Sequence, residues 1–83
     1  MGNKTLDGLK VVRVARMISL LPGIQIRVGK NHPFIATRSG AVPCPIASST
    51  HVKNMVVPWI AQATGYNKKE IYSSLRFGTW QYT

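Results

Sequence analysis

Acidic side chains are scarce in this sequence of 83 residues, which has Asp7 and Glu70 against eleven Lys and Arg. A two-metal nuclease site needs several oxygen ligands, and two carboxylates cannot supply them. Two histidines and one cysteine are also too few for a structural zinc site built from cysteines. We therefore expect any chemistry on this chain to proceed without a metal or another cofactor.

Cysteine and long apolar runs are scarce as well. Cys44 is the single cysteine, so no internal disulfide can form, and we interpret it as a small apolar residue packed in a strand. No stretch reaches the roughly 18 apolar residues that a membrane span needs, and the first residues lack the regions of a signal peptide. The sequence predicts one small cytoplasmic domain over residues 1–83.

Positive charge is abundant, because the formal net charge is +9. Such a balance favours polyanionic partners, of which nucleic acid and a membrane surface are the main classes. The basic residues are spread from Lys4 to Arg76 rather than gathered in one run. This spread is typical of a folded domain with a charged face, so the sequence favours nucleic acid over a membrane anchor.

The chain begins with the apolar spacing of an amphipathic helix and continues with stretches in which apolar and polar residues alternate. Apolar residues at spacings of three and four predict a helix over residues 9–21, capped by Asp7 and ended by Pro22-Gly23. Residues 24–28, 32–38 and 41–46 then predict a three-stranded antiparallel meander. The third strand contains Pro43 and Pro45, which suit a sheet edge because proline has no amide hydrogen to donate.

Two more helices are predicted in the C-terminal part. The first spans residues 55–64, with Asn54 as its cap and Pro58 in its first turn, where the missing amide costs least. Gly65 ends it, and Asn67 with Glu70 forms a capping box for a helix that ends near Gly78. Trp80 and Tyr82 follow, and we expect them to dock on the core or on a partner.

Short motifs along this order of elements resemble the HicA family of mRNA-cleaving toxins. Members have a Gly-hydrophobic strand start, a lysine-containing turn that ends in histidine, a Gly turn and a Val-Pro strand. Here these are Gly23-Ile24, Lys30-Asn31-His32, Ser39-Gly40 and Val42-Pro43. Residues 51–75, HVKNMVVPWIAQATGYNKKEIYSSL, are similar to the family's lysine-containing approach to a helix, which a Gly and a short helix follow. The resemblance covers most of the chain.

The resemblance implies a fold, an activity and a partner. The fold is α+β and double-stranded-RNA-binding-domain-like, α-β-β-β-α with a three-stranded antiparallel sheet, here with an extra short C-terminal helix. The activity is that of a metal-independent endoribonuclease, an mRNA interferase. The partner is a HicB-type antitoxin that covers the active site, and an acidic inhibitory protein would also suit the charge of +9.

His32 is the residue that we expect to carry the reaction. RNA can be cut without a metal when its own 2′-hydroxyl attacks phosphorus, which needs a base, an acid and positive charge. Histidine suits the first two roles near neutral pH. His51 is the second acid/base candidate, although a helix-start role is the simpler interpretation of it. The residues expected to contact RNA are Arg27, Lys30, Asn31, Arg38 and Lys53.

Two other functions remain open from the residues themselves. Residues 55–77 have the spacing of a helix-turn-helix, and Lys68 and Lys69 at the start of its second helix would suit DNA phosphates. That interpretation leaves the meander and its histidine unexplained. Alternatively, the chain is a noncatalytic RNA-binding module that holds phosphates and 2′-hydroxyls.

Overall fold

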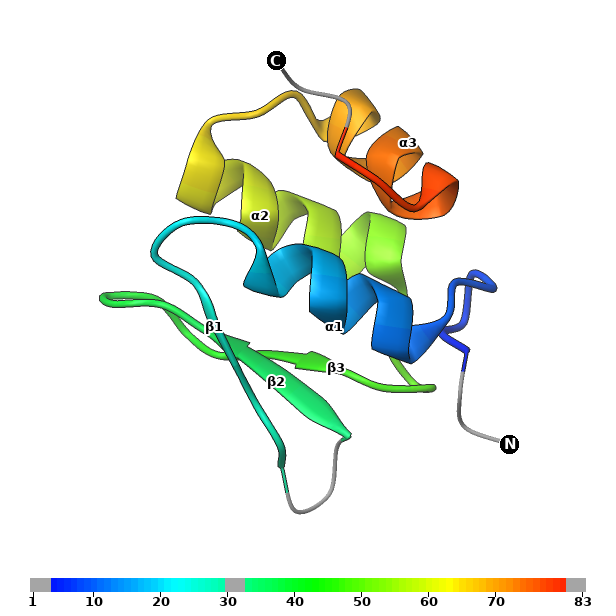
Figure 1. The fold of residues 1–83 in the computed structure, drawn as a ribbon, viewed down its shortest axis with the longest axis horizontal. Coiled ribbons are helices and arrows are strands. Elements are labelled where there is room, and N and C mark those ends of the chain that lie inside the picture. The colour runs from blue at the N-terminus through cyan, green and yellow to red at the C-terminus, as the bar shows by residue number, and fades with distance from the viewer. Residues whose placement is uncertain (1–3, 30–32, 81–83) are drawn as a thin grey trace.

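A three-stranded sheet and a set of helices make up the structure, a computed structural model that describes residues 4–29 and 33–80 (Figure 1). The described elements, in chain order, are α1 (Val11–Ser19), β1 (Gln25–Arg27), β2 (Phe34–Thr37), β3 (Cys44–Ile46), the π-helical turn η1 (Val52–Val56), α2 (Val57–Thr64) and α3 (Lys68–Phe77). This order confirms the predicted small α+β layout.

The sheet has the order β1-β2-β3, and both strand pairs are antiparallel. Ala36 lies opposite Ile26 on one side and Cys44 on the other, and this row faces the core. Ile35 lies opposite Arg27 and Pro45, so these residues belong to the other face. β3 is an edge strand, as predicted, but it is shorter than the predicted 41–46, so that Pro45 lies within it and Pro43 precedes it.

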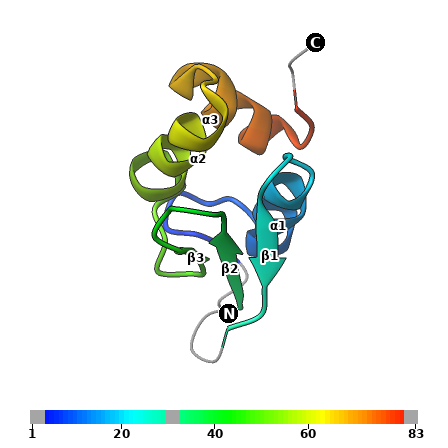
Figure 2. The same cartoon turned by 90° about the vertical axis from the view of Figure 1, so that its left-hand side faces the viewer.

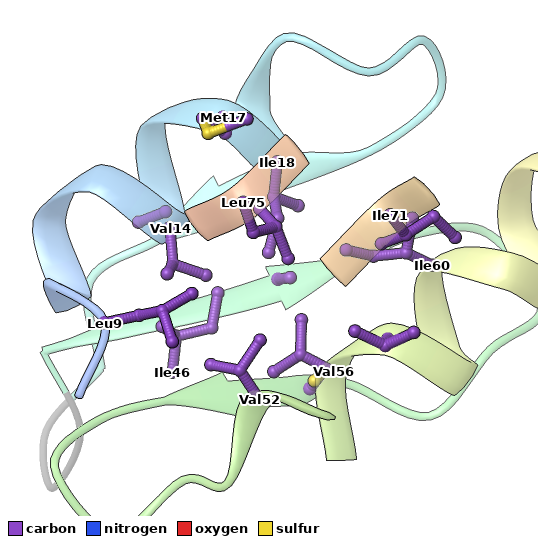
Figure 3. Close-up of a cluster of buried hydrophobic side chains, with 14 of the residues drawn as sticks. Leu9, Val14, Met17, Ile18, Ile46, Val52, Val56, Ile60, Ile71 and Leu75 are labelled. Carbon is purple, nitrogen blue, oxygen red and sulfur yellow. The ribbon is translucent and has the colours of Figure 1, made fainter. Parts of the chain in front are cut away.

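The helices cover one face of the sheet in two layers. α1 packs on all three strands and η1 packs on β3, whereas α3 packs on α1 and α2 (Figures 1 and 2). α3 therefore lies farthest from the sheet. Buried aliphatic side chains from every layer meet in one cluster, in which Ile18, Ile46, Ile60, Ile71 and Leu75 have almost no exposed surface (Figure 3).

The start of α1 differs from the prediction. The helix begins at Val11, and its N-cap residue Lys10 makes no side-chain capping bond within the described part of the chain. Asp7 does not cap α1, because the chain makes a separate turn between Asp7 and the helix. Gly8 has φ +83° in this turn, and the Leu9 amide donates to the Thr5 hydroxyl. The carboxylate caps η1 instead, far along the chain.

The helix that contains Pro58 begins earlier than predicted, at Val52, and its first turn is π-helical. The Val57 amide bonds the carbonyl of Val52, five residues back. We attribute the wide turn to Pro58, whose ring would crowd the carbonyl four residues before it in a regular α-helix. The capping residue also differs from the predicted Asn54. It is His51, whose Nδ1 accepts a hydrogen bond from the backbone amide of Asn54 at 3.3 Å.

The predicted end of α2 and the predicted start and end of α3 are confirmed. Gly65 ends α2 in the left-handed conformation at φ +78°. The Asn67 side chain then accepts the amides of Lys69 and Glu70, and Gly78 ends α3. Trp80 docks on the core, where its Nε1 donates to the Met17 carbonyl at 2.8 Å. Tyr82 lies outside the described residues.

Across residues 4–29 and 33–80, no helix has the length and apolar character needed to cross a membrane.

Candidate nucleic-acid interface

Two adjoining grooves on the helical side of the molecule collect most of the basic residues. The larger has a volume of about 420 Å³ and lies between α3 and the start of the η1–α2 helix. The smaller, of about 220 Å³, lies between the N-terminal segment, the start of α1 and α3. Arg76 lines both grooves. We call their cations the basic face: Lys4, Lys10, Arg13, Lys53, Lys68, Lys69 and Arg76.

The basic face is concentrated, because it holds seven of the eleven Lys and Arg of the chain. All seven are exposed. Of the two acidic side chains, Glu70 lines neither groove, and Asp7 lines the smaller one with its oxygens occupied by hydrogen bonds. The resulting positive field is suited to phosphate groups, which Lys and Arg bind by charge-assisted hydrogen bonds.

The helical period of α3 places its cations on the groove. Ile71, Ser74 and Leu75 are buried against the other helices. Lys69, Ser73 and Arg76 follow spacings of four and three and therefore share the opposite, exposed face. The guanidinium of Arg76 lies over the Tyr72 ring, 5.7 Å from its centre. This cation–π contact fixes one wall of the larger groove.

Asp7 connects the elements that form the two grooves. Its oxygens accept hydrogen bonds from the amides of Val52 at 3.0 Å and Lys53 at 3.1 Å. They also accept from the hydroxyls of Thr5 at 2.8 Å and Tyr72 at 3.0 Å. One carboxylate therefore holds the N-terminal segment, the first amides of η1 and the middle of α3 in a fixed relation.

The hydrogen bonds of Asp7 change its acidity. Burial alone would raise the pKa of this carboxyl, but the bonds from Val52, Thr5, Lys53 and Tyr72 outweigh burial and lower the pKa to about 2. Asp7 is therefore ionised at neutral pH. Its negative charge also lies at the N-terminal end of a helix, where the helix dipole favours an anion.

The arginines predicted to contact RNA are separated in the sheet. Arg27 is exposed and opposite Ile35, on the sheet face that the helices leave open, at the end of β1 that leads to residues 30–32. Arg38 follows Thr37 at the other end of β2, on the helix side, with its guanidinium 5.7 Å from the centre of the Trp59 ring. Its Nε is buried and has no hydrogen-bond partner among the described residues. The structure does not bring the two side chains together.

The remaining predicted residues divide into three groups. Lys30, Asn31 and His32 lie outside the described residues, so the roles proposed for them stay predictions. Lys53 lies on the basic face, in the larger groove. His51 serves as the N-cap of η1, which is the helix-start role expected as its simpler interpretation.

Neither the Cys44 thiol nor a cluster of metal-binding side chains offers a reactive centre among the described residues. Cys44 is buried, and desolvation raises the pKa of its thiol to about 11, so it stays protonated at neutral pH. This agrees with its interpretation as a small packed residue. Within residues 4–29 and 33–80, no three His, Cys, Asp or Glu side chains form a group that could hold a metal ion.

Part of this interface does not follow from the sequence predictions. They assign Lys68 and Lys69 to DNA phosphates alone, and Arg13, Arg76 and Tyr72 to no binding role. The period of the exposed residues on α3 is the available signal, because positions 69, 73 and 76 fall on one face. No local pattern points to the role of Asp7, whose partners Val52 and Tyr72 are 45 and 65 residues away.

Comparisons with protein-family models, with curated proteins and with solved structures find no match for this chain. The HicA resemblance therefore depends on the short motifs alone.

Proposed function

We propose that this chain binds RNA through its basic face and cleaves it as a metal-independent endoribonuclease. The observation that supports binding is the gathering of seven exposed cations along two adjoining grooves. Contacts of this kind supply most of the affinity of a protein for a nucleic-acid backbone. Asp7 also ties together three of the segments that carry these cations, so the backbone of these segments is fixed in relative position.

The proposal of cleavage rests on the sequence motif around His32. Residues 30–32 come between β1 and β2 in the sequence, and Arg27, the last residue of β1, is exposed. A histidine there would act as general base or acid on the 2′-hydroxyl or the leaving oxygen, and Arg27, Lys30 and Asn31 would hold the phosphate. The helix, three-strand, helix order supports the finer proposal of a double-stranded-RNA-binding-domain-like fold.

A protein partner belongs to the same proposal. The HicA resemblance implies a HicB-type antitoxin, and a surface with this charge favours an acidic protein. An inhibitor seated on the basic face would compete with RNA directly. We propose that the chain acts on mRNA in the cytoplasm and is held inactive there by such a partner.

Charge-removing substitutions test the binding step. We expect Arg76→Gln to weaken the binding of a single-stranded RNA about 4-fold near 0.15 M salt, because one positive charge of the basic face is lost. The triple variant Lys53→Gln, Lys69→Gln, Arg76→Gln should weaken it about 50-fold. The measurement is a fluorescence-anisotropy titration of a labelled 12-nucleotide RNA.

Arg16→Gln is the matched control for this experiment. Arg16 is also an exposed arginine on a helix, it carries the same charge, and it lines neither groove. We expect its affinity for RNA to stay within twofold of the wild type. Equal losses for Arg16→Gln and Arg76→Gln would show that net charge, and not the basic face, determines binding.

A DNA-binding helix-turn-helix is the second function that the geometry allows. α2 and α3 are joined by residues 65–67 with a left-handed Gly65, which is the connection that such a motif uses. Lys68 and Lys69 at the start of α3 are exposed. Sequence-specific binding of duplex DNA, stronger than binding of RNA in the same titration, would favour this function over the one proposed.

A further inference from the structure

We infer that the larger groove of the basic face is a site for one unpaired nucleotide, with its phosphate on the lysines and its base on the Tyr72–Arg76 wall. This deepens the proposed function and rests on it. The groove lies between η1 and α3.

The size and shape of this groove suit a small ligand rather than a flat backbone contact. Its volume of about 420 Å³ falls in the range of sites that hold small molecules and cofactors, roughly 300–1,000 Å³. Its cations come from two sides, Lys53 from η1 and Lys68 and Lys69 from α3. Ammonium groups on opposing walls can hold the RNA phosphates from two sides, which a flat surface cannot do.

The other side chains of the groove match the remaining parts of a nucleotide. The half-buried Tyr72 ring offers an apolar surface, and the buried Val57 supports the groove from the core. An aromatic ring and an arginine plane are the two surfaces on which unpaired bases stack. Asn54 and Ser73 are exposed polar side chains in the same groove, and they can bond a base edge or a ribose hydroxyl.

Tyr72 is held in place before any ligand binds. Its hydroxyl donates to Asp7 at 3.0 Å, and Arg76 lies over its ring. The same Asp7 accepts the amide of Lys53, so the wall for the base and a lysine for the phosphate share one anchor. Such prior order lowers the entropic cost of binding. A base in a duplex has both faces covered by its neighbours, and the inference is therefore specific for single strands.

The test is a set of titrations followed by amide chemical shifts in NMR spectra. The ligands are adenosine 5′-monophosphate, inorganic phosphate, and a 12-nucleotide RNA as a single strand and as a duplex. We expect the mononucleotide and the single strand to shift the amides of Asn54, Lys69 and Ser73. Inorganic phosphate should bind at least 10-fold more weakly than the mononucleotide, because it has no base to stack.

Variants at position 72 separate stacking from the anchoring of the hydroxyl. Tyr72→Phe keeps the ring and should keep the affinity for the mononucleotide within about 3-fold. Tyr72→Leu removes the ring and should lower that affinity about 10-fold while leaving inorganic phosphate binding unchanged. The dispersion of the amide spectrum of each variant reports whether the fold is intact.

Several results would overturn the inference. Equal affinities for inorganic phosphate and the mononucleotide would mean that the groove holds no base. Equal shifts with the duplex and the single strand, or equal mononucleotide affinities for Tyr72→Phe and Tyr72→Leu, would also contradict it. RNA binding that is lost in the triple variant while the mononucleotide gives no shifts would overturn this inference and leave the proposed function intact.

Discussion

His32→Ala should lower the rate of RNA cleavage by a factor of about 10² to 10⁴, measured in EDTA with a radiolabelled RNA, because a general acid or base contributes that much. The affinity for RNA should change by less than 3-fold, since the basic face lies on other elements. The cleavage rate therefore tests the role of His32, and the affinity for RNA tests the role of the basic face. Expression of the wild type, but not of His32→Ala, should inhibit the growth of a bacterial host.

His51→Ala is the matched control for this substitution. His51 is the other histidine, and in the structure its Nδ1 caps η1. Its loss should cost about 1 kcal/mol of stability, as for other N-caps, and leave most of the cleavage rate. Equal cleavage rates for the wild type and His32→Ala would remove His32 from the mechanism. No cleavage by either protein, with RNA binding retained, would favour the noncatalytic RNA-binding module.

Asp7→Asn should destabilise the fold more than the loss of the His51 cap. The carboxylate accepts four hydrogen bonds, and bonds to a charged group are each worth about 1.5–3 kcal/mol. An asparagine offers one oxygen and turns its amide hydrogens toward the remaining donors. We expect a loss of about 3 kcal/mol in the free energy of unfolding, measured by urea denaturation.

The same carboxylate makes the free energy of unfolding of the wild type depend on pH in the acidic range. The pKa of Asp7 is about 2 in the folded protein and 3.8 as an unperturbed group. Its contribution is therefore fully present above pH 3.8 and is lost as the pH falls toward 2. The decrease should be about 1–2 kcal/mol, after allowance for the partial exposure of the carboxyl.

Glu70→Gln provides the comparison for this pH dependence, since Glu70 is the other acidic side chain. It is exposed in the first turn of α3, and its substitution should change stability by less than about 1 kcal/mol. The decrease in stability below pH 3.8 should persist in Glu70→Gln and disappear in Asp7→Asn. If it persists in both variants, Asp7 is not the group responsible.

Local signals in the sequence predicted the elements and several of their ends. The meander followed from period-two alternation, the edge position of β3 from Pro43 and Pro45 in and before it, and the caps at Asn67 and Gly65 from residue type. The failures have a common cause. Asp7 was assigned to the nearest helix, whereas the structure pairs it with amides 45 and 46 residues away, and a sequence pattern carries no information on such contacts.

The candidate interface was predicted less well than the fold. The net charge indicated a nucleic-acid partner. Arg27 and Arg38 were predicted to act together because both lie near one histidine in the sequence, but the structure places them at opposite ends of a hairpin and on opposite faces of the sheet. Arg38 instead stacks on Trp59, a residue 21 positions later in the chain. The packing of α3 on α1 and α2, which brings Arg76 beside both grooves, is a tertiary feature that no local period reveals.

If the seven cations of the basic face bind the RNA backbone together, the affinity depends steeply on salt concentration, and this dependence is the most direct test. Each phosphate contact with a single strand contributes about −0.7 to the slope of log K against log salt concentration, so we expect a slope near −5. The triple variant Lys53→Gln, Lys69→Gln, Arg76→Gln should reduce its magnitude by about 2. A wild-type slope shallower than about −2, or a slope that the triple substitution leaves unchanged, would contradict the account.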